Sequence, residues 1–248
     1  TLKLFEVCRL RDIPILTFIN KVDREGLNPF ELLDEIEQTL ALNVCPMVWP
    51  VGMGGLFHGC FDLRNRNFLT ATNEPGGRFD SVQHTKGVHD DFFDDKVSAA
   101  VLPAFREDVM LALSGYSEFE ATSYREGHLT PVYFGSALKD FAVNELLQAL
   151  TDHAPTPGIQ AAEPREIQPD EDSVSGFVFK VQANMDKNHR DRIAFLRLCS
   201  GCFKRGMKLR QARTGKTMAV SNPTLFFAQE RKLAEDALPG DIIGIPNH

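Results

Sequence analysis

The residues with the clearest chemical meaning are Asn20-Lys21-Val22-Asp23, which directly follow an apolar run at residues 13–19. An ionised carboxylate can accept two parallel N–H donors at once, and guanine presents such a pair in N1–H and the exocyclic N2–H. Adenine has no such pair. Adenine would leave a buried carboxylate unpaired, and sites of this kind can discriminate between two such ligands by roughly 10⁴-fold. Asp23 is therefore the candidate for specificity towards a ligand that carries such a pair of donors.

A second polar loop, Gly135-Ser136-Ala137-Leu138-Lys139, follows another apolar strand predicted at residues 131–135. If the two strands are neighbours in one parallel sheet, their carboxyl-end loops line the same crevice, where open α/β sheets bind ligands. Taken singly, Gly135-Ser136 could be an ordinary turn, and a strand-end Asn or Asp is often a turn former. The two loops together favour a binding site.

The elements around these loops predict an α/β domain with a parallel sheet. Asn28 followed by Pro29 is typical of a helix start, and the apolar spacing elsewhere predicts further helices and strands. We expect helices at 1–12, 28–40, 92–114 and 141–153, strands at 13–19 and 131–135, and a β-rich insertion over about 46–100. The domain is expected to span residues 1–158.

The remainder of the chain predicts a smaller β domain. Residues 159–172 read as an exposed linker, and residues 173–248 alternate short strands with glycine turns. That rhythm predicts a small β-barrel, which we expect to be incomplete at its carboxyl end. Strands are expected at 177–182, 192–198, 207–210 and 241–245.

Charge separates the two parts of the chain. Up to Asp172 there are 14 basic and 28 acidic residues, whereas 13 basic and 6 acidic residues follow it. Clustered positive charge attracts phosphate backbones, so the second part is predicted to face a polyanion. A merely solvated basic face is the alternative that charge alone leaves open.

Composition indicates a cytosolic globular protein. Apolar residues make up 43% of the chain, and no apolar stretch approaches the roughly 20 residues of a membrane span. We expect the five cysteines to be free thiols, because their number is odd and their spacing is not that of a disulfide framework. Cys199-Ser200-Gly201-Cys202 lacks a second pair, and the seven histidines show no ligand-like grouping, so no metal site is predicted.

No element for phosphate chemistry is recognisable. The chain has no G-x-x-x-x-G-K-(S/T) loop, and no D-x-x-G element precedes Asn20 to hold a metal ion and an attacking water. No catalytic residue can therefore be named. We expect the chain to be part of a longer protein, without GTP hydrolysis or tight nucleotide binding of its own.

The two loops match known motifs. Asn20–Asp23 matches the NKxD motif of GTPases, and Ser136-Ala137-Leu138 resembles their SAL loop. Residues 9–18, 177–186 and 189–195 resemble the bacterial peptide chain release factor 3 family of translational GTPases, and the similarity spans nearly the whole chain. It is least clear over residues 58–100.

The resemblance implies a truncated P-loop-type G domain followed by a translation-factor β-barrel. It further implies a parent protein that binds GTP or GDP with Mg²⁺, hydrolyses GTP on the ribosome and promotes dissociation of the class I release factors that read stop codons. Lys21 would lay its stem over the base, Asn20 would tie the loops together, and loop N–H groups would reach O6. The implied guanine-binding residues are Asn20, Lys21, Asp23, Ser136, Ala137 and Leu138.

Basic residues of the second domain are candidate ribosome contacts, because they account for much of its positive charge. Asp186 and Asp191 lie among them and could simply pair with them on the surface. The candidates are Lys187, His189, Arg190, Arg192, Arg205, Lys208, Arg210 and Arg213. No membrane or DNA partner is expected.

Two other functions stay open from the sequence. One is a fragment of an elongation factor G-like translocase, which has the same domain order. The other is an RNA- or ribosome-binding module in which the nucleotide loops no longer function.

Overall fold

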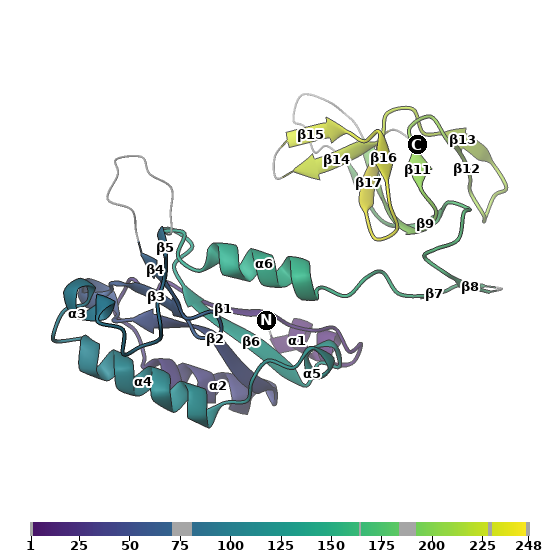
Figure 1. Ribbon diagram of the computed structural model, residues 1–248. Helices are drawn as coiled ribbons and strands as arrows, with labels where there is room; N and C mark the ends of the chain where they lie inside the picture. The colour runs from purple at the N-terminus through teal and green to yellow at the C-terminus, as the bar shows by residue number, and fades with distance from the viewer. Residues whose placement is uncertain (1, 71–80, 164, 184–191, 228–229, 247–248) are drawn as a thin grey trace. The chain divides into compact units, whose positions relative to one another are not determined.

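The computed structural model describes residues 2–70, 81–163, 165–183, 192–227 and 230–246. The chain divides into two compact units, Thr1–Ala154 and Pro155–His248 (Figure 1). Among the described residues, no helix is both long and apolar enough to cross a membrane.

The first unit is built on a six-stranded sheet in the order β1-β6-β2-β3-β4-β5. β1 pairs parallel with β6, and β6 pairs parallel with β2, whereas β3, β4 and β5 add antiparallel strands. The parallel part places the carboxyl ends of β1 and β6 at one edge of the sheet. The strands are β1 (Thr17–Asn20), β2 (Asn43–Val51), β3 (Gly59–Asp62), β4 (Asn67–Thr70), β5 (Ser81–His84) and β6 (Leu129–Gly135).

Helices cover both faces of this sheet. Figure 1 shows α2 and α4 on one side and α6 on the other. The start of α2 follows its sequence, since Pro29 is the first helical residue and the Asn28 side chain accepts a hydrogen bond from the Phe30 N–H at 2.9 Å. The helices are α1 (Leu2–Arg9), α2 (Pro29–Leu40), α3 (Phe92–Lys96), α4 (Leu102–Gly115), α5 (Ala121–Arg125) and α6 (Val143–His153), with a 3₁₀ turn at Gly54–Leu56.

Three local expectations differ from the structure. The single helix expected at 92–114 is two helices, α3 and α4, with residues 97–101 between them. The strand expected at 13–19 begins only at Thr17 and is half-buried, because β1 is an edge strand of the sheet. Pro14 cannot donate to a strand ladder, which is consistent with the late start. The strands expected as an insertion continue the main sheet instead, and β2 lies inside it, buried from Val44 to Val51.

The second unit is antiparallel. Its main sheet has the order β15-β14-β17-β10-β9, and short pairs β11–β16, β12–β13 and β7–β8 accompany it. The strands are β7 (Gln160–Ala161), β8 (Glu166–Ile167), β9 (Ser175–Ala183), β10 (Arg192–Ser200), β11 (Phe203–Lys204), β12 (Lys208–Arg210), β13 (Thr217–Ala219), β14 (Thr224–Phe227), β15 (Glu230–Leu233), β16 (Asp236–Ala237) and β17 (Ile242–Pro246).

The predicted fold class, an α/β domain with a parallel sheet followed by a β-rich domain, is confirmed. The residues expected to form a linker contain the β7–β8 pair, and Arg165 binds Glu171 through both carboxylate oxygens at 2.6 and 2.8 Å. The small core of the second unit includes Leu198, Phe203 and Ile243.

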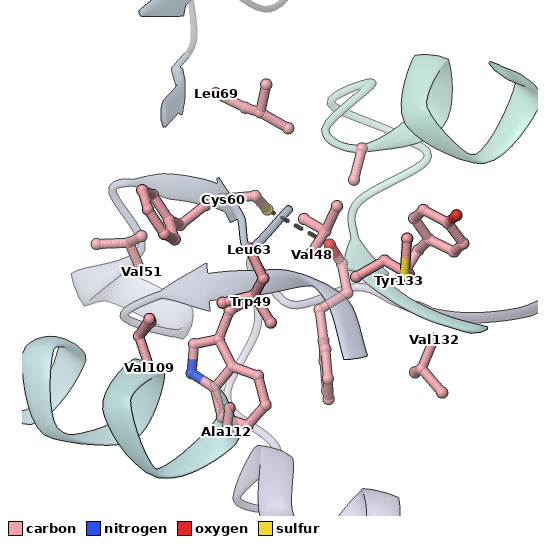
Figure 2. Packing of buried hydrophobic residues seen from close by; sticks show 14 of the residues in the cluster. Val48, Trp49, Val51, Cys60, Leu63, Leu69, Val109, Ala112, Val132 and Tyr133 are labelled. Atoms are coloured by element: carbon pink, nitrogen blue, oxygen red, sulfur yellow. Dashed lines mark hydrogen bonds between the residues drawn. The ribbon is translucent and has the colours of Figure 1, made fainter. Parts of the chain in front are cut away.

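Aromatic side chains dominate the core of the first unit. Trp49 is fully buried, with ring centroids 4.8 Å from Phe30 and 5.4 Å from Phe134. Figure 2 shows Trp49 beside Val109 and Ala112 of α4. The Cys60 thiol donates to the Phe134 carbonyl at 3.5 Å. The packing of α4 onto β2, and the pairing of β2 with β6 and β3, hold the sheet that carries the strand-end loops.

We expect Phe93→Ala to destabilise the first unit by about 3–5 kcal/mol, because it removes a large side chain from a closed core. The Phe93 ring is fully buried and lies 5.2–5.9 Å from the rings of Phe61, Phe68 and Phe105. Urea unfolding followed by fluorescence of Trp49, the single tryptophan, measures the change. Phe92→Ala, at the half-buried neighbouring position, is the control and should lower the free energy of unfolding clearly less. Equal losses in the two variants would contradict this account of the core.

Candidate functional site

The carboxyl ends of β1 and β6 bring the two polar loops together. Asn20 is paired with Gly135 in the parallel register, and the Val22 N–H donates to the Gly135 carbonyl at 3.1 Å. These residues are separated by more than a hundred positions in the sequence. The strand pairing alone therefore places the Asn20–Asp23 loop directly against the Ser136–Lys139 loop.

Asn20 fastens the loops to each other. Its side-chain oxygen Oδ1 accepts a hydrogen bond from the Lys21 N–H at 2.8 Å and another from the Ala137 N–H at 2.9 Å. Lys21 has a φ of 72°, a left-handed conformation that non-glycine residues rarely adopt and that the local hydrogen bonds support. One amide oxygen thus orders its own loop and the neighbouring loop together.

Gly135 allows the second loop to approach Phe141 and Phe18 closely. A Cβ atom at this position would lie 2.3 Å from the Phe141 carbonyl oxygen and 2.7 Å from Cζ of Phe18. Beyond it, Ser136 and Phe141 exchange two backbone hydrogen bonds of 3.0 and 3.1 Å, which close the loop. A side chain at position 135 would force β1 and this loop apart.

Asp23 presents a largely buried carboxylate, with only 9% of its side chain exposed. The Ser136 hydroxyl is the main cause that lowers the pKa of Asp23; the Lys139 ammonium lowers it further, and burial opposes both. The Ser136 oxygen, itself buried, has no hydrogen bond of good geometry. We therefore attribute its effect on Asp23 to a nearby hydroxyl dipole rather than to a well-formed hydrogen bond. The carboxylate remains ionised at neutral pH and can accept N–H donors.

The remaining predicted residues lie on the same two loops. Lys21 and Ala137 are exposed, and the Leu138 side chain is 82% exposed. Lys139 was not predicted as part of the site, yet its Nζ lies 3.5 Å from Asp23 Oδ2. Its position next to the Ser136–Leu138 loop was the only sequence feature that could have pointed to it.

The arrangement is suited to binding rather than to reaction. It combines an ionised carboxylate, which can accept paired N–H donors, with a lysine stem, which can cover a flat ring, and with ordered loop amides. The described residues contain no group of three or more His, Cys, Asp or Glu side chains that could hold a metal ion. In Cys199-Ser200-Gly201-Cys202 the first thiol is buried and the second exposed, and both are free.

The candidate polyanion contacts are only partly described. Lys187, His189 and Arg190 lie outside the described residues, as do Asp186 and Asp191, and Arg192 begins β10. Arg205 is already engaged, since it bonds the Ser221 carbonyl at 2.9 Å and Glu235 at 3.1 Å.

The hairpin of β12 and β13 carries the other basic candidates. Lys208 and Arg210 are exposed on β12, while Leu209 between them faces the core, and Arg213 is exposed in the turn. Residues 192–229 contain no Asp or Glu. The hairpin therefore offers cations that no acidic residue in that segment neutralises.

We expect Asn20→Ala to loosen the second loop, because it removes the acceptor of the Ala137 N–H. Amide exchange at Ala137 should accelerate, with a loss of about 1 kcal/mol of stability. Hydrogen exchange followed by NMR measures it. Asn28→Ala, which removes the cap of α2 at a similar cost, is the control and should leave Ala137 unchanged. Unaltered Ala137 exchange in Asn20→Ala would refute the fastening role.

Comparison with known proteins places both parts of the chain in known families. Residues 1–156 match the family described as elongation factor Tu GTP binding domain, and residues 173–248 match elongation factor G domain 2. A crystal structure of a protein from Thermus thermophilus has a similar fold, with a TM-score of 0.68 and 20% sequence identity. The similarity covers 98% of this chain but only 36% of that one. The first family match spans more than half of the residues of this chain. The chain therefore belongs to the translational GTPase family.

Proposed function

We propose that this chain is the guanine-reading part of a ribosome-dependent GTPase acting in translation termination. The observation that carries the proposal is the double hydrogen bond to Asn20 Oδ1, which holds the Asp23 loop and the Ala137 loop on one edge of the sheet. Parallel α/β sheets bind ligands at this edge.

The base would be read by direct hydrogen bonds. Asp23 would accept N1–H and N2–H of guanine together, and the exposed Lys21 stem would cover the ring. The Ala137 N–H already donates to Asn20. Guanine O6 would therefore share that N–H with Asn20 in a three-centre hydrogen bond, an arrangement that proteins commonly use.

The residues present suit the base but not the phosphates. The 248 residues include no phosphate-cradling loop, and no group of metal-ligating side chains occurs in the described ranges. Mg²⁺ and the phosphates of GTP or GDP would be held by other segments of a longer parent, where the metal would stabilise charge during phosphoryl transfer. The chain by itself would bind guanine weakly and would not hydrolyse GTP.

The proposed role of the parent is to promote departure of class I release factors from the ribosome after peptide release. Support comes from the stretches at residues 9–18, 177–186 and 189–195, which resemble release factor 3. The match of residues 173–248 to an elongation factor G domain suits translocation equally well. Ribosome assays of the parent separate the two roles: faster release-factor turnover supports the proposal, and tRNA translocation without it overturns the proposal.

We expect Asp23→Asn to move base preference from guanine towards xanthine, because the new amide donor would face xanthine O2 instead of a guanine N–H. Titration of the chain with guanosine, xanthosine and adenosine, followed by NMR, measures the preference. Asp34→Asn on the exposed face of α2 is the control and should keep the wild-type order. Guanosine preference that survives Asp23→Asn would count against base reading by this carboxylate.

A second candidate function is RNA binding by the basic hairpin of β12 and β13, since Lys208, Arg210 and Arg213 are exposed there. The two functions are compatible in one ribosomal factor. Binding of RNA without guanosine recognition would favour a module in which the nucleotide loops no longer function.

If the hairpin binds phosphates, Lys208→Met combined with Arg210→Met should weaken RNA binding and flatten its salt dependence. Two lost phosphate contacts would reduce the log–log salt slope by about 1.4–1.8. Filter binding of structured RNA to the whole chain across salt concentrations measures the slope. Lys96→Met on α3 is the matched control, and a double variant with the wild-type slope would exclude the hairpin.

A further inference from the structure

The candidate base-reading carboxylate is paired with a cation of its own chain. Lys139 Nζ lies 3.5 Å from Asp23 Oδ2, with the Lys139 side chain 53% exposed and the Asp23 side chain 9% exposed. The backbone of Lys139 is held in place, because its N–H donates to the Ser136 carbonyl at 3.2 Å. The ammonium therefore reaches the carboxylate from a fixed point on the neighbouring loop.

We propose that Lys139 competes with guanine for the Asp23 carboxylate. The lysine pairs with Asp23 when no base is bound and leaves it when the base binds. This inference rests on the proposed function, since it concerns the regulation of that same site. It assigns Lys139 a role in setting affinity, whereas Asp23 itself sets specificity.

Competition follows from the number of acceptors. Guanine needs both oxygens of the carboxylate for its two parallel donors, and the ammonium takes one of them. Because most of the Asp23 side chain is buried, little open surface remains where both partners could bind at once. Lys139 can withdraw readily, since its half-exposed, four-carbon stem can swing its ammonium into water.

The lysine is not required to keep the carboxylate ionised. The Ser136 hydroxyl is the larger cause of the lowered pKa of Asp23, and it remains when Lys139 is removed. Asp23 in a Lys139→Met variant is therefore still ionised at neutral pH. The remaining effect of the substitution is to free one oxygen of the carboxylate.

The experiment is a titration of the whole chain with guanosine at neutral pH, followed by NMR. Guanosine has no phosphate, so its binding reports the base site alone. Lys139→Met should bind guanosine about 1.5- to 5-fold more tightly than wild type, the range expected for a partly exposed ion pair. Lys139→Arg keeps the cation, and Lys96→Met removes a distant one; both should match wild type.

Salt gives a second readout. Added salt screens the Lys139–Asp23 pair, so guanosine affinity should rise with ionic strength in wild type and stay flat in Lys139→Met. If Lys139→Met prefers guanosine to adenosine but binds it no more tightly than wild type, the competitor role is wrong and base reading stands. If no variant prefers guanosine to adenosine, the proposed function fails and this inference fails with it.

Discussion

One side-chain oxygen connects the two halves of the candidate site. Asn20 Oδ1 accepts hydrogen bonds from its own loop at Lys21 and from the distant loop at Ala137. Both loops extend from paired parallel strands, so the sheet brings them close and the asparagine fixes their relative position. Gly135 makes this approach possible, because any side chain there would collide with Phe141 and Phe18. The site is thus set by the strand pairing together with the Asn20 side chain.

The electrostatics of the site follow from the same loops. Burial alone would raise the pKa of Asp23, but the neighbouring Ser136 hydroxyl and Lys139 ammonium outweigh it and lower the pKa. Both neighbours come from the second loop, so the charge state of the carboxylate depends on the loops meeting. A carboxylate kept ionised is a strong acceptor for N–H donors. The ionisation of Asp23 and the docking of the two loops are therefore linked physically.

The rest of the first unit supports the edge of the sheet where the loops after β1 and β6 meet. Trp49, Phe93 and Phe134 are fully buried and tie the central strands to the helices. The antiparallel strands β3, β4 and β5 continue the sheet on the side away from β1. The second unit has its own small core around Phe203 and Ile243, and Lys208, Arg210 and Arg213 are exposed on its β12–β13 hairpin. Acidic residues predominate up to Asp172, and basic residues predominate after it.

The sequence by itself determined the features that depend on neighbouring residues. The Asn20–Asp23 motif at a strand end, the glycine before Ser136 and the Asn28 cap of α2 could all be recognised from local patterns. Short strands and glycine turns likewise predicted a β-rich second domain. Each of these features follows from residue types within a few positions of one another.

Only the tertiary structure decided the rest. It showed that β2 to β5 continue the main sheet, that β1 is a short edge strand, and that Lys139 contacts Asp23. Periodicity reports whether a segment is apolar on one face, but it does not report which strand pairs with it. The Lys139–Asp23 contact joins residues more than a hundred positions apart, and it exists because parallel pairing of β1 with β6 sets one loop beside the other.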